Sequence, residues 1–198
     1  MAKLSILSAS ETELFLQSMF FPCQKETSAL KQTRNHCLCC LMLYAGLRVS
    51  EAVKLIISDV HNPDFPITTL TIRKEIAKKQ HERHIPINHA LARAIEMYKR
   101  KLFLGNILLS TDFLFPAKSP GKHLTVRQVQ RIVEHHSVLS LSRKIHPHAL
   151  RHTFATRLMR VTNIRVVQEL LGHKNLSSTQ IYTHPNSDDL RLAVSAIT

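Results

Sequence analysis

Three residues in the segment "HPHALRHTFAT" (146–156) have the types and the spacing to do chemistry together. His148, Arg151 and His152 stand at i, i+3 and i+4, so a helix that begins near Pro147 would place them on one face. Imidazole and guanidinium groups in such a cluster favour an anionic ligand. A solvated basic face is the plainer interpretation, so the cluster needs support from the rest of the chain.

Further groups that could act on an anion are spread along the sequence. Arg48 follows a glycine in "GLRVSEA", and lysines are concentrated between two β-type segments. His173 stands in "LGHKN", and Tyr182 follows nine residues later in "TQIYTH". Guanidinium groups stay charged at every working pH and offer paired donors to phosphate oxygens. The combination therefore supports an anionic ligand.

The net charge favours a nucleic acid partner. The chain has 27 Lys and Arg against 14 Asp and Glu, a formal charge of +13, and residues 1–30 hold two lysines and three glutamates, so the remainder carries +14. Tryptophan is absent and other aromatic residues are few, so backbone contact with a duplex is favoured over base stacking on a single strand. We expect duplex DNA as the partner, and neither a membrane nor a small-molecule substrate.

Length and composition indicate one compact domain. With 198 residues and 44% apolar content, the chain can bury an ordinary core. No apolar run approaches the ~20 residues of a membrane span, and the N-terminal apolar stretch is too short for a secretion signal. A cytoplasmic location is therefore expected.

The cysteines allow two interpretations. Cys37 and Cys40 have C-x-x-C spacing with His36 alongside, which could suggest a metal knuckle, but no second pair of ligands completes it. The same stretch is strongly apolar, so buried thiols that pack as small hydrophobes are favoured for Cys37, Cys39, Cys40 and also Cys23. No metal and no other cofactor is predicted.

The elements that must position these residues are mostly helices. Ser10 with Glu13 and Thr125 with Gln128 have capping-box spacing, Ser50 is a candidate N-cap, and Gly46 and Gly172 are candidate helix stops. The helical segments are 10–21, 33–45, 48–56, 88–103, 125–136, 149–160, 164–171, 177–184 and 188–197. Two alternating β-branched runs, 68–74 and 82–87, predict an antiparallel hairpin. The fold class is α+β, mainly helical, with one small antiparallel sheet.

The order of these groups resembles the tyrosine recombinase (phage integrase) family, whose catalytic domain carries Arg, Lys, His-x-x-Arg, His and Tyr in that order. The resemblance covers essentially the whole chain, from "GLRVSEA" through "HALRHTFATRL" to "LGHKNLSSTQIYTH". It implies a recombinase that cleaves and rejoins duplex DNA through a covalent 3′-phosphotyrosyl intermediate, without a cofactor. It also implies self-association on DNA, as a synaptic tetramer.

The resemblance assigns roles that the chemistry of the residues supports. Arg48 and Arg151 would clamp the non-bridging oxygens, and His173 would donate to one of them. His148 would accept the tyrosine proton or bind the phosphate. Tyr182 would attack phosphorus, because adjacent cations favour its phenolate.

The general acid is expected from the hairpin. The family pattern there is Gly-Lys-Gly-x-Lys-x-Arg followed by Pro, and this chain reads "IAKKQHERHIP". Counting back from Arg83 and Pro86 selects Lys78, with Lys79 as the alternative, because both glycines of the pattern are replaced.

Supporting roles are expected for other residues. Glu51 would orient Arg48, although an acid in the first turn of a helix also suits the helix dipole. The residues expected to contact DNA are Lys74, Lys79, Arg83, Arg127 and Arg131. His152 is expected to contact a backbone carbonyl or the shell of the site. His135, His136, His146 and His184 are expected at the surface or in loops, and Tyr44 and Tyr98 in the core or at its rim.

Three questions stay open at this point. Residues 1–198 are expected to form a single catalytic domain without the family's N-terminal core-binding domain, either as an excised domain or as a short member similar to the fimbrial invertases. A catalytically silent DNA-binding regulator and a relaxing enzyme like the type IB topoisomerases are the rival functions. Leu190, Val194 and Ile197 form an apolar stripe that could dock on a neighbouring protomer or in cis.

Overall fold

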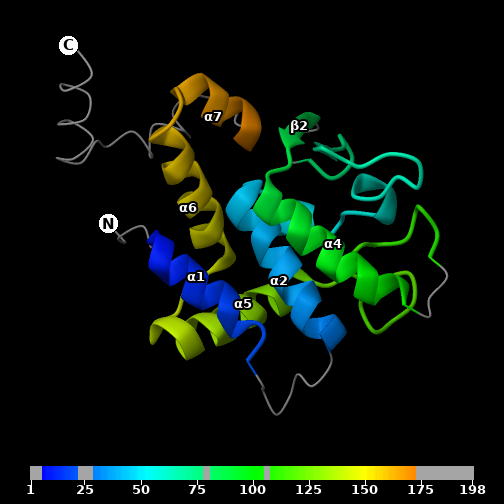
Figure 1. Cartoon of the computed structure of the whole chain (residues 1–198), viewed down its shortest axis with the longest axis horizontal. Helices are drawn as coiled ribbons and strands as arrows, with labels where there is room; N and C mark the ends of the chain where they lie inside the picture. Colours follow the sequence, from blue (N-terminus) through cyan, green and yellow to red (C-terminus); the bar gives the residue numbers. More distant parts are fainter. Residues whose placement is uncertain (1–5, 22–28, 78–80, 105–107, 173–198) are drawn as a thin grey trace.

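The computed structural model describes residues 6–21, 29–77, 81–104 and 108–172 (Figure 1). Within them the chain forms α-helices, one short 3-10 helix and two strands, so the predicted α+β class with a small antiparallel sheet is confirmed. In chain order the elements are α1 (Ala9–Ser18), α2 (Ala29–Tyr44), α3 (Val49–Ala52), the 3-10 helix η1 (Ile57–Asp59), β1 (Thr69–Ile72), β2 (Arg83–Pro86), α4 (His89–Phe103), α5 (Val126–Leu141), α6 (Pro147–Met159) and α7 (Ile164–Leu171).

The core is built around α2. This helix packs against both α4 and α6, while α1 packs on α5 (Figure 1). The residues from Cys37 to Leu43 are all buried, so this stretch of α2 is covered on every side, as expected for a helix without a polar face. None of the described helices combines the length and the apolarity that a bilayer span requires.

The cysteines of α2 are part of this core. Cys37, Cys39 and Cys40 are fully or almost fully buried. Burial raises the pKa of the Cys40 thiol to about 12 and holds the pKa values of the other two well above their usual range. Among the described residues no three His, Cys, Asp or Glu side chains gather in a way that could hold a metal ion. Core packing is therefore confirmed for these three thiols, while Cys23 lies outside the described residues.

The first helix starts earlier than predicted. Ser8, and not Ser10, is the N-cap of α1: its hydroxyl accepts the Glu11 N–H at 3.1 Å, and the Glu11 carboxylate accepts the Ser8 N–H at 2.9 Å. The predicted box of Ser10 and Glu13 was therefore wrong. The two pairs have the same spacing two residues apart, and the one nearer the N-terminus closes the first turn.

Some other predicted helix boundaries are confirmed, whereas α2 begins four residues earlier, α3 ends four residues earlier and α5 ends five residues later than predicted. Thr125 caps α5, with its hydroxyl accepting the Gln128 N–H and the Gln128 side chain accepting the Thr125 N–H. Pro147 occupies the first turn of α6. Gly172 ends α7 with φ +63°, a left-handed conformation that favours glycine.

The predicted hairpin is also present. β1 and β2 pair antiparallel, with Thr69 opposite Pro86 at one end and Ile72 opposite Arg83 at the other. Arg83 and Ile85 alternate with exposed residues on β2, so both point into the molecule. An arginine thus takes a position on the core side of the sheet.

One histidine departs from its predicted place. His136 is buried at 3% exposure, although it was expected at the surface. It follows Val129 and Val133 on the inner face of α5, and its Nδ1 lies 3.3 Å from the hydroxyl of Ser18 on α1. The helical spacing of these residues explains the burial. His135 and His146 are exposed, as predicted, and His184 lies outside the described residues.

The two tyrosines of the helical core are where they were expected. Tyr98 is buried and its hydroxyl donates to the Leu114 carbonyl at 2.8 Å. Tyr44 is half-buried at the end of α2. Burial raises the pKa of Tyr98 well above its usual range, so its phenol stays protonated at neutral pH.

Candidate active site

The first turns of α6 place His148, Arg151 and His152 close together but at different depths. His148 is exposed, whereas Arg151 and His152 are 1% and 8% exposed, so the cluster is not a solvated basic face. The rings of His148 and His152 meet edge to face with centroids 4.1 Å apart. Burial, helped by the charges of His148 and Arg151, lowers the pKa of His152 to about 4. His152 is therefore neutral at neutral pH, which limits charge repulsion within the cluster.

Arg151 ties three elements together. From α6 its guanidinium donates through Nη1 to the carbonyl of Gly46, in the turn after α2, and through Nη2 to the carbonyl of Leu171 at 2.8 Å. Leu171 is the last residue of α7, where the helix dipole is negative and a cation is favoured. The arginine predicted to clamp phosphate is thus buried and held in one orientation.

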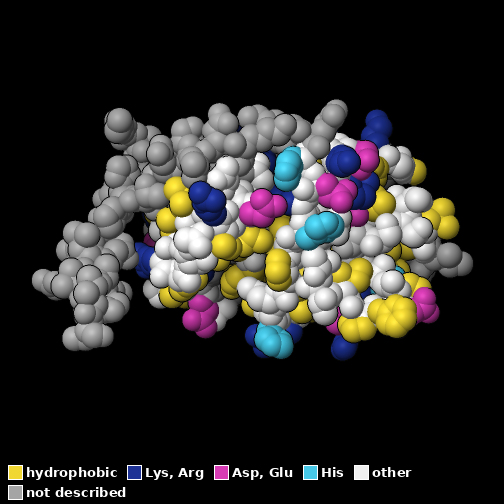
Figure 2. Space-filling model, turned by 90° about the horizontal axis from the view of Figure 1, so that it is seen from above, with side chains coloured by type: hydrophobic (Ala, Val, Ile, Leu, Met, Phe, Trp, Pro, Cys, Tyr) yellow, Lys and Arg dark blue, Asp and Glu magenta, His cyan; other side chains and the backbone are white. Residues whose placement is uncertain are grey.

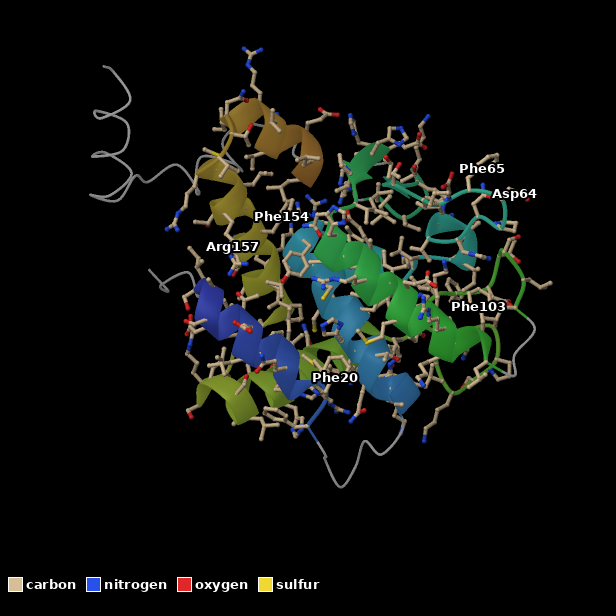
Figure 3. The ribbon with its side chains drawn as sticks, viewed as in Figure 1. Phe20, Asp64, Phe65, Phe103, Phe154 and Arg157 are labelled. Carbon is tan, nitrogen blue, oxygen red and sulfur yellow. The ribbon has the colours of Figure 1, made fainter. Side chains whose placement is uncertain are left out.

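The turn before Arg48 is packed tightly against α6. Gly46 has φ +61°, and a Cβ there would overlap the ring of Phe154. Figure 3 shows Phe154 on α6 at its junction with α2. Only glycine fits both the backbone conformation and the space. This close approach fixes where the chain emerges at Arg48.

Arg48 is held by the first turn of α3. It is the N-cap residue, which corrects the predicted cap at Ser50: the Glu51 carboxylate accepts the Arg48 N–H at 2.8 Å, so the helix begins two residues earlier. The other carboxylate oxygen binds Arg48 Nη1 at 2.9 Å. The Arg48 side chain is 20% exposed. The contact that the predicted supporting role of Glu51 requires is therefore present.

Glu51 also binds Arg83, and both side chains are almost completely buried. Burial alone would raise the pKa of Glu51, but the hydrogen bonds and charge of Arg83, followed by those of Arg48, lower it to about 2. The carboxylate is therefore ionised throughout the neutral range. Arg83 was predicted to contact DNA, but in this structure its guanidinium faces the interior and pairs with Glu51 instead.

The remaining predicted residues fall into two groups. Lys74, Arg127 and Arg131 are exposed, as a DNA contact requires. On the face shown in Figure 2, acidic, basic and histidine side chains are interspersed. Four predicted residues lie outside the described part of the chain: Lys78, Lys79, His173 and Tyr182.

Sequence reasoning missed the pairing of Arg83 with Glu51. The signal was present on β2, because Arg83 has the same alternation phase as Ile85, and that phase predicts a core position. A buried arginine needs a buried acid, and Glu51 was already assigned to Arg48. The second partner could not be read from spacing, because the two residues are 32 positions apart.

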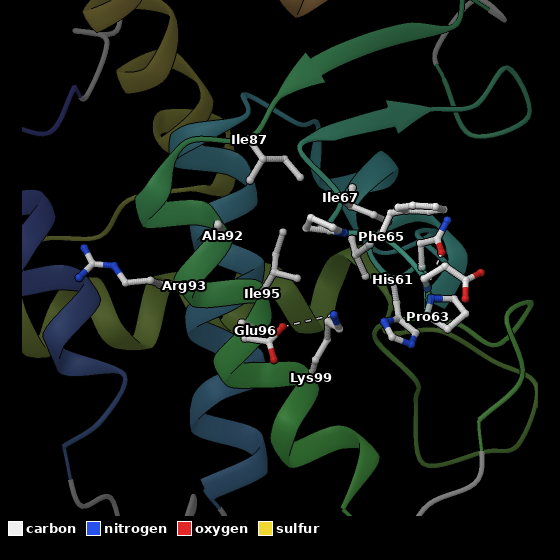
Figure 4. Close-up of a pocket in the computed structure, with 14 residues that line it drawn as sticks. His61, Pro63, Phe65, Ile67, Ile87, Ala92, Arg93, Ile95, Glu96 and Lys99 are labelled. Carbon is white, nitrogen blue, oxygen red and sulfur yellow. Dashed lines mark hydrogen bonds and ion pairs between the residues drawn. The ribbon is translucent and has the colours of Figure 1, made fainter.

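A hollow of about 580 Å³ lies elsewhere, between α4 and the loop 60–67 (Figure 4). Phe65, Ile67, Ile87 and Ile95 contribute to its apolar lining, and Glu96 pairs with Lys99 at its edge. None of the predicted catalytic residues among the described positions lines it. It is therefore separate from the arginine–histidine site.

The fold and the described side chains define a mainly helical α+β domain in which the buried Glu51 holds the partly exposed Arg48. Residues 16–188 match the phage integrase family, and the chain belongs to that family. The tyrosine recombinase XerC of Oceanobacillus iheyensis is 44% identical over 161 residues, which are 77% of this chain and 50% of that protein. The chain spans about half the length of the curated relatives it matches.

Solved structures of recombinases are similar as well. A crystal structure of the XerH site-specific recombinase bound to difH substrate, in a pre-cleavage complex, matches with a TM-score of 0.74 and 29% identity over 98% of this chain and 55% of that chain. The catalytic domain of bacteriophage HP1 integrase matches over 98% of this chain and 95% of its own, with a TM-score of 0.61. At 22% identity, the second match supports the fold alone.

Proposed function

We propose that this chain cleaves and rejoins duplex DNA at specific sites through a 3′-phosphotyrosyl intermediate. The observation that carries the proposal is the buried Glu51 carboxylate, which fixes the partly exposed Arg48. His148 and Arg151 follow on α6 in the order of the family's catalytic residues. Family membership and the similarity to XerC and XerH recombinases give independent support.

Arg48 and Arg151 would stabilise the negative charge that develops on the non-bridging oxygens of the phosphate. A guanidinium has five N–H donors, so an Arg48 that binds Glu51 through Nη1 keeps donors for a non-bridging oxygen. Because Glu51 is ionised and buried, Arg48 is oriented before the substrate arrives. A preorganised donor of this kind typically contributes on the order of 10²–10³ in rate.

The covalent step needs residues from outside the described part of the chain. The Tyr182 oxygen attacks phosphorus, and the bond from phosphorus to the 5′ oxygen breaks. The phenol proton passes to His148, and the departing 5′ oxygen takes a proton from Lys78. The phosphotyrosyl bond retains the energy of the broken diester, so the reverse attack by a 5′ hydroxyl reseals the strand.

The proposed partner is duplex DNA, with self-association on it as a synaptic tetramer and a cytoplasmic location. The XerH neighbour was solved bound to difH substrate, and the +14 charge outside residues 1–30 of this chain suits duplex DNA. The exposed Lys74, Arg127 and Arg131 would supply part of the contact with the DNA backbone.

The test is the capture of the intermediate. The chain is incubated with a pool of nicked duplexes that carry a randomised central sequence, so that the cleaved strand fragment diffuses away and the adduct accumulates. We expect a denaturant-resistant species with the DNA 3′ phosphate on Tyr182, and none with Tyr182→Phe, which removes one oxygen and keeps the ring. Tyr44→Phe is the matched control and should still form it. An adduct in Tyr182→Phe, or none with the parent chain, would refute the proposal.

A further inference from the structure

Arg83 is a buried arginine whose described contacts all point toward the candidate site. It begins β2, and its side chain is 1% exposed. Nη2 donates to Glu51 Oε2 at 2.7 Å, Nη1 donates to Oε1 at 3.2 Å, and Nε donates to the carbonyl of Leu170 at 3.0 Å. The guanidinium therefore grips the carboxylate with both ends of its fork, a geometry that lysine cannot reproduce.

Arg48 and Arg83 together supply four hydrogen-bond donors to the Glu51 carboxylate. Oε1 accepts Nη1 of Arg48 and Nη1 of Arg83, and Oε2 accepts the backbone N–H of Arg48 and Nη2 of Arg83. An ionised carboxylate has about four acceptor sites, so these four donors saturate it. Without the Arg83 fork, two of the four acceptors would lose their donors, and the carboxylate could turn. The orientation of Arg48 thus depends on Arg83.

The third contact of Arg83 extends the same network to α7. Arg83 donates a hydrogen bond to the carbonyl of Leu170, and Arg151 donates one to the next carbonyl, that of Leu171. Gly172 follows in a left-handed conformation, and a Cβ there would lie 3.2 Å from the Cδ of Arg83. Two arginines therefore hold consecutive carbonyls at the negative end of α7. Arg83 joins β2, α3 and α7 around one carboxylate.

We propose that Arg83 is a positioning residue for strand cleavage, which acts through Glu51 on Arg48, and that it is not a DNA contact. The inference rests on the proposed function, because it concerns the rate of the same cleavage step. A buried arginine–glutamate pair can also serve the fold alone. The experiment must therefore measure something that a purely structural pair would leave unchanged.

The experiment compares two substrates in single-turnover cleavage at saturating DNA. One is a nicked duplex with an ordinary scissile phosphate, and the other has a methylphosphonate there, which replaces one charged oxygen by a methyl group. A neutral linkage places less demand on the Arg48 guanidinium, so defects that act through Arg48 should shrink on it. The variant is Arg83→Lys, which keeps the charge and loses the fork.

We expect Arg83→Lys to cleave the phosphate duplex about 10- to 100-fold more slowly, with DNA affinity within about threefold of the parent. On the methylphosphonate the slowing should fall to within about threefold, again relative to the parent chain on the same substrate. Each comparison is a ratio of substrates within one protein preparation, so a reduced folded fraction cancels. Arg48→Lys should show the same pattern, and the double variant should be less than multiplicative.

The matched control is Arg73→Lys. Arg73 stands at the same end of the hairpin and binds the carboxylate of Asp59 through Nε at 2.8 Å, but it does not contact Glu51. It should show no substrate dependence. Equal slowing of Arg83→Lys on both substrates would assign Arg83 to the fold, and loss of affinity with unchanged cleavage would assign it to DNA binding. Either result overturns the inference, whereas a parent chain that forms no adduct overturns the proposed function itself.

Discussion

Two carboxylate–arginine pairs anchor the hairpin, and they are built on the same plan. Glu51 accepts the backbone N–H of Arg48, the N-cap of α3, and binds Arg83 on β2. Asp59 accepts the backbone N–H at the start of η1 and binds Arg73, which directly follows β1. In each pair a carboxylate closes the first turn of a short helix and also receives a guanidinium from the hairpin.

The difference between the pairs lies in burial and in one additional partner. Arg83 and Glu51 are 1% and 0% exposed, whereas Arg73 and Asp59 are 30% and 4% exposed. Glu51 also binds Arg48, the arginine predicted to hold phosphate. The same local motif thus links Asp59 to Arg73 at the hairpin, and at Glu51 it forms part of the candidate active site. The Arg48 side chain, which binds Glu51 in addition to Arg83, makes the difference.

The largest effect is expected at Lys78, the proposed general acid. Lys78→Ala should slow cleavage about 10²- to 10⁴-fold, the usual range for loss of proton transfer, with DNA binding nearly unchanged. A duplex with sulfur in place of the 5′ oxygen needs little protonation of the leaving group, so it should restore the rate. The methylphosphonate should not, which is the opposite of the pattern expected for Arg83→Lys.

These two rescue patterns test whether the buried Arg83–Glu51 pair acts through Arg48. If sulfur also rescues Arg83→Lys, the buried pair acts through the hairpin lysine and not through Arg48. If sulfur rescues Lys79→Ala and not Lys78→Ala, the general acid moves by one residue. Cleavage rates of Lys78→Ala, Lys79→Ala and Arg83→Lys on the three duplexes decide between these outcomes.

The next effect concerns stability. Glu51→Gln leaves the buried Arg83 without a counter-charge, so the free energy of unfolding should fall by about 3–5 kcal/mol. Asp59→Asn should lower it by only about 1 kcal/mol, because the partly exposed Arg73 can turn to water. Urea unfolding at neutral pH measures both. Equal losses would show that the two pairs do not differ in their contribution to the fold.

The pH dependence of urea unfolding tests whether the Glu51 carboxylate is ionised in the folded chain. The pKa of Glu51 is about 2 in the folded chain against an ordinary value of 4.5, so its stabilisation is fully present above pH 4.5 and is lost as pH falls toward 2. A shift of that size corresponds to about 3 kcal/mol. The deficit of Glu51→Gln relative to the parent should therefore shrink as the solution is acidified. A deficit that stays constant with pH would contradict the ionised state of Glu51.

Local signals were sufficient for most of the fold. The Thr125 capping box, the glycine end of α7 and the alternation on both strands were predicted from a few neighbouring residues, because caps, left-handed turns and sheet faces are decided locally. The start of α1 was misplaced because two capping boxes with equal spacing overlap. His136 was misplaced although its helical phase with Val133 indicated an inner position.

The candidate site was predictable in its residue types but not in its connections. The order of Arg48, His148 and Arg151 was read from the chain, and the contact of Glu51 with Arg48 was expected from the supporting role assigned to Glu51. The burial of Arg83 depends on an acid 32 positions away, and the contacts of Arg151 are to backbone carbonyls, which every residue has. Such long-range pairings leave no local pattern in a single sequence.

The smallest expected effect is that of Lys74, the exposed neighbour of Arg73. If Lys74 contacts a phosphate, Lys74→Ala should weaken duplex binding and reduce the slope of log affinity against log salt by about 0.9, because one fewer counterion is released. Cleavage at saturating DNA should stay unchanged. Lys101→Ala, an exposed lysine in the last turn of α4, is the control and should not alter the slope. A slower cleavage step in Lys74→Ala would mean that exposed cations of the hairpin also enter the chemistry, and the division between a buried network that sets rate and a surface that sets affinity would fail.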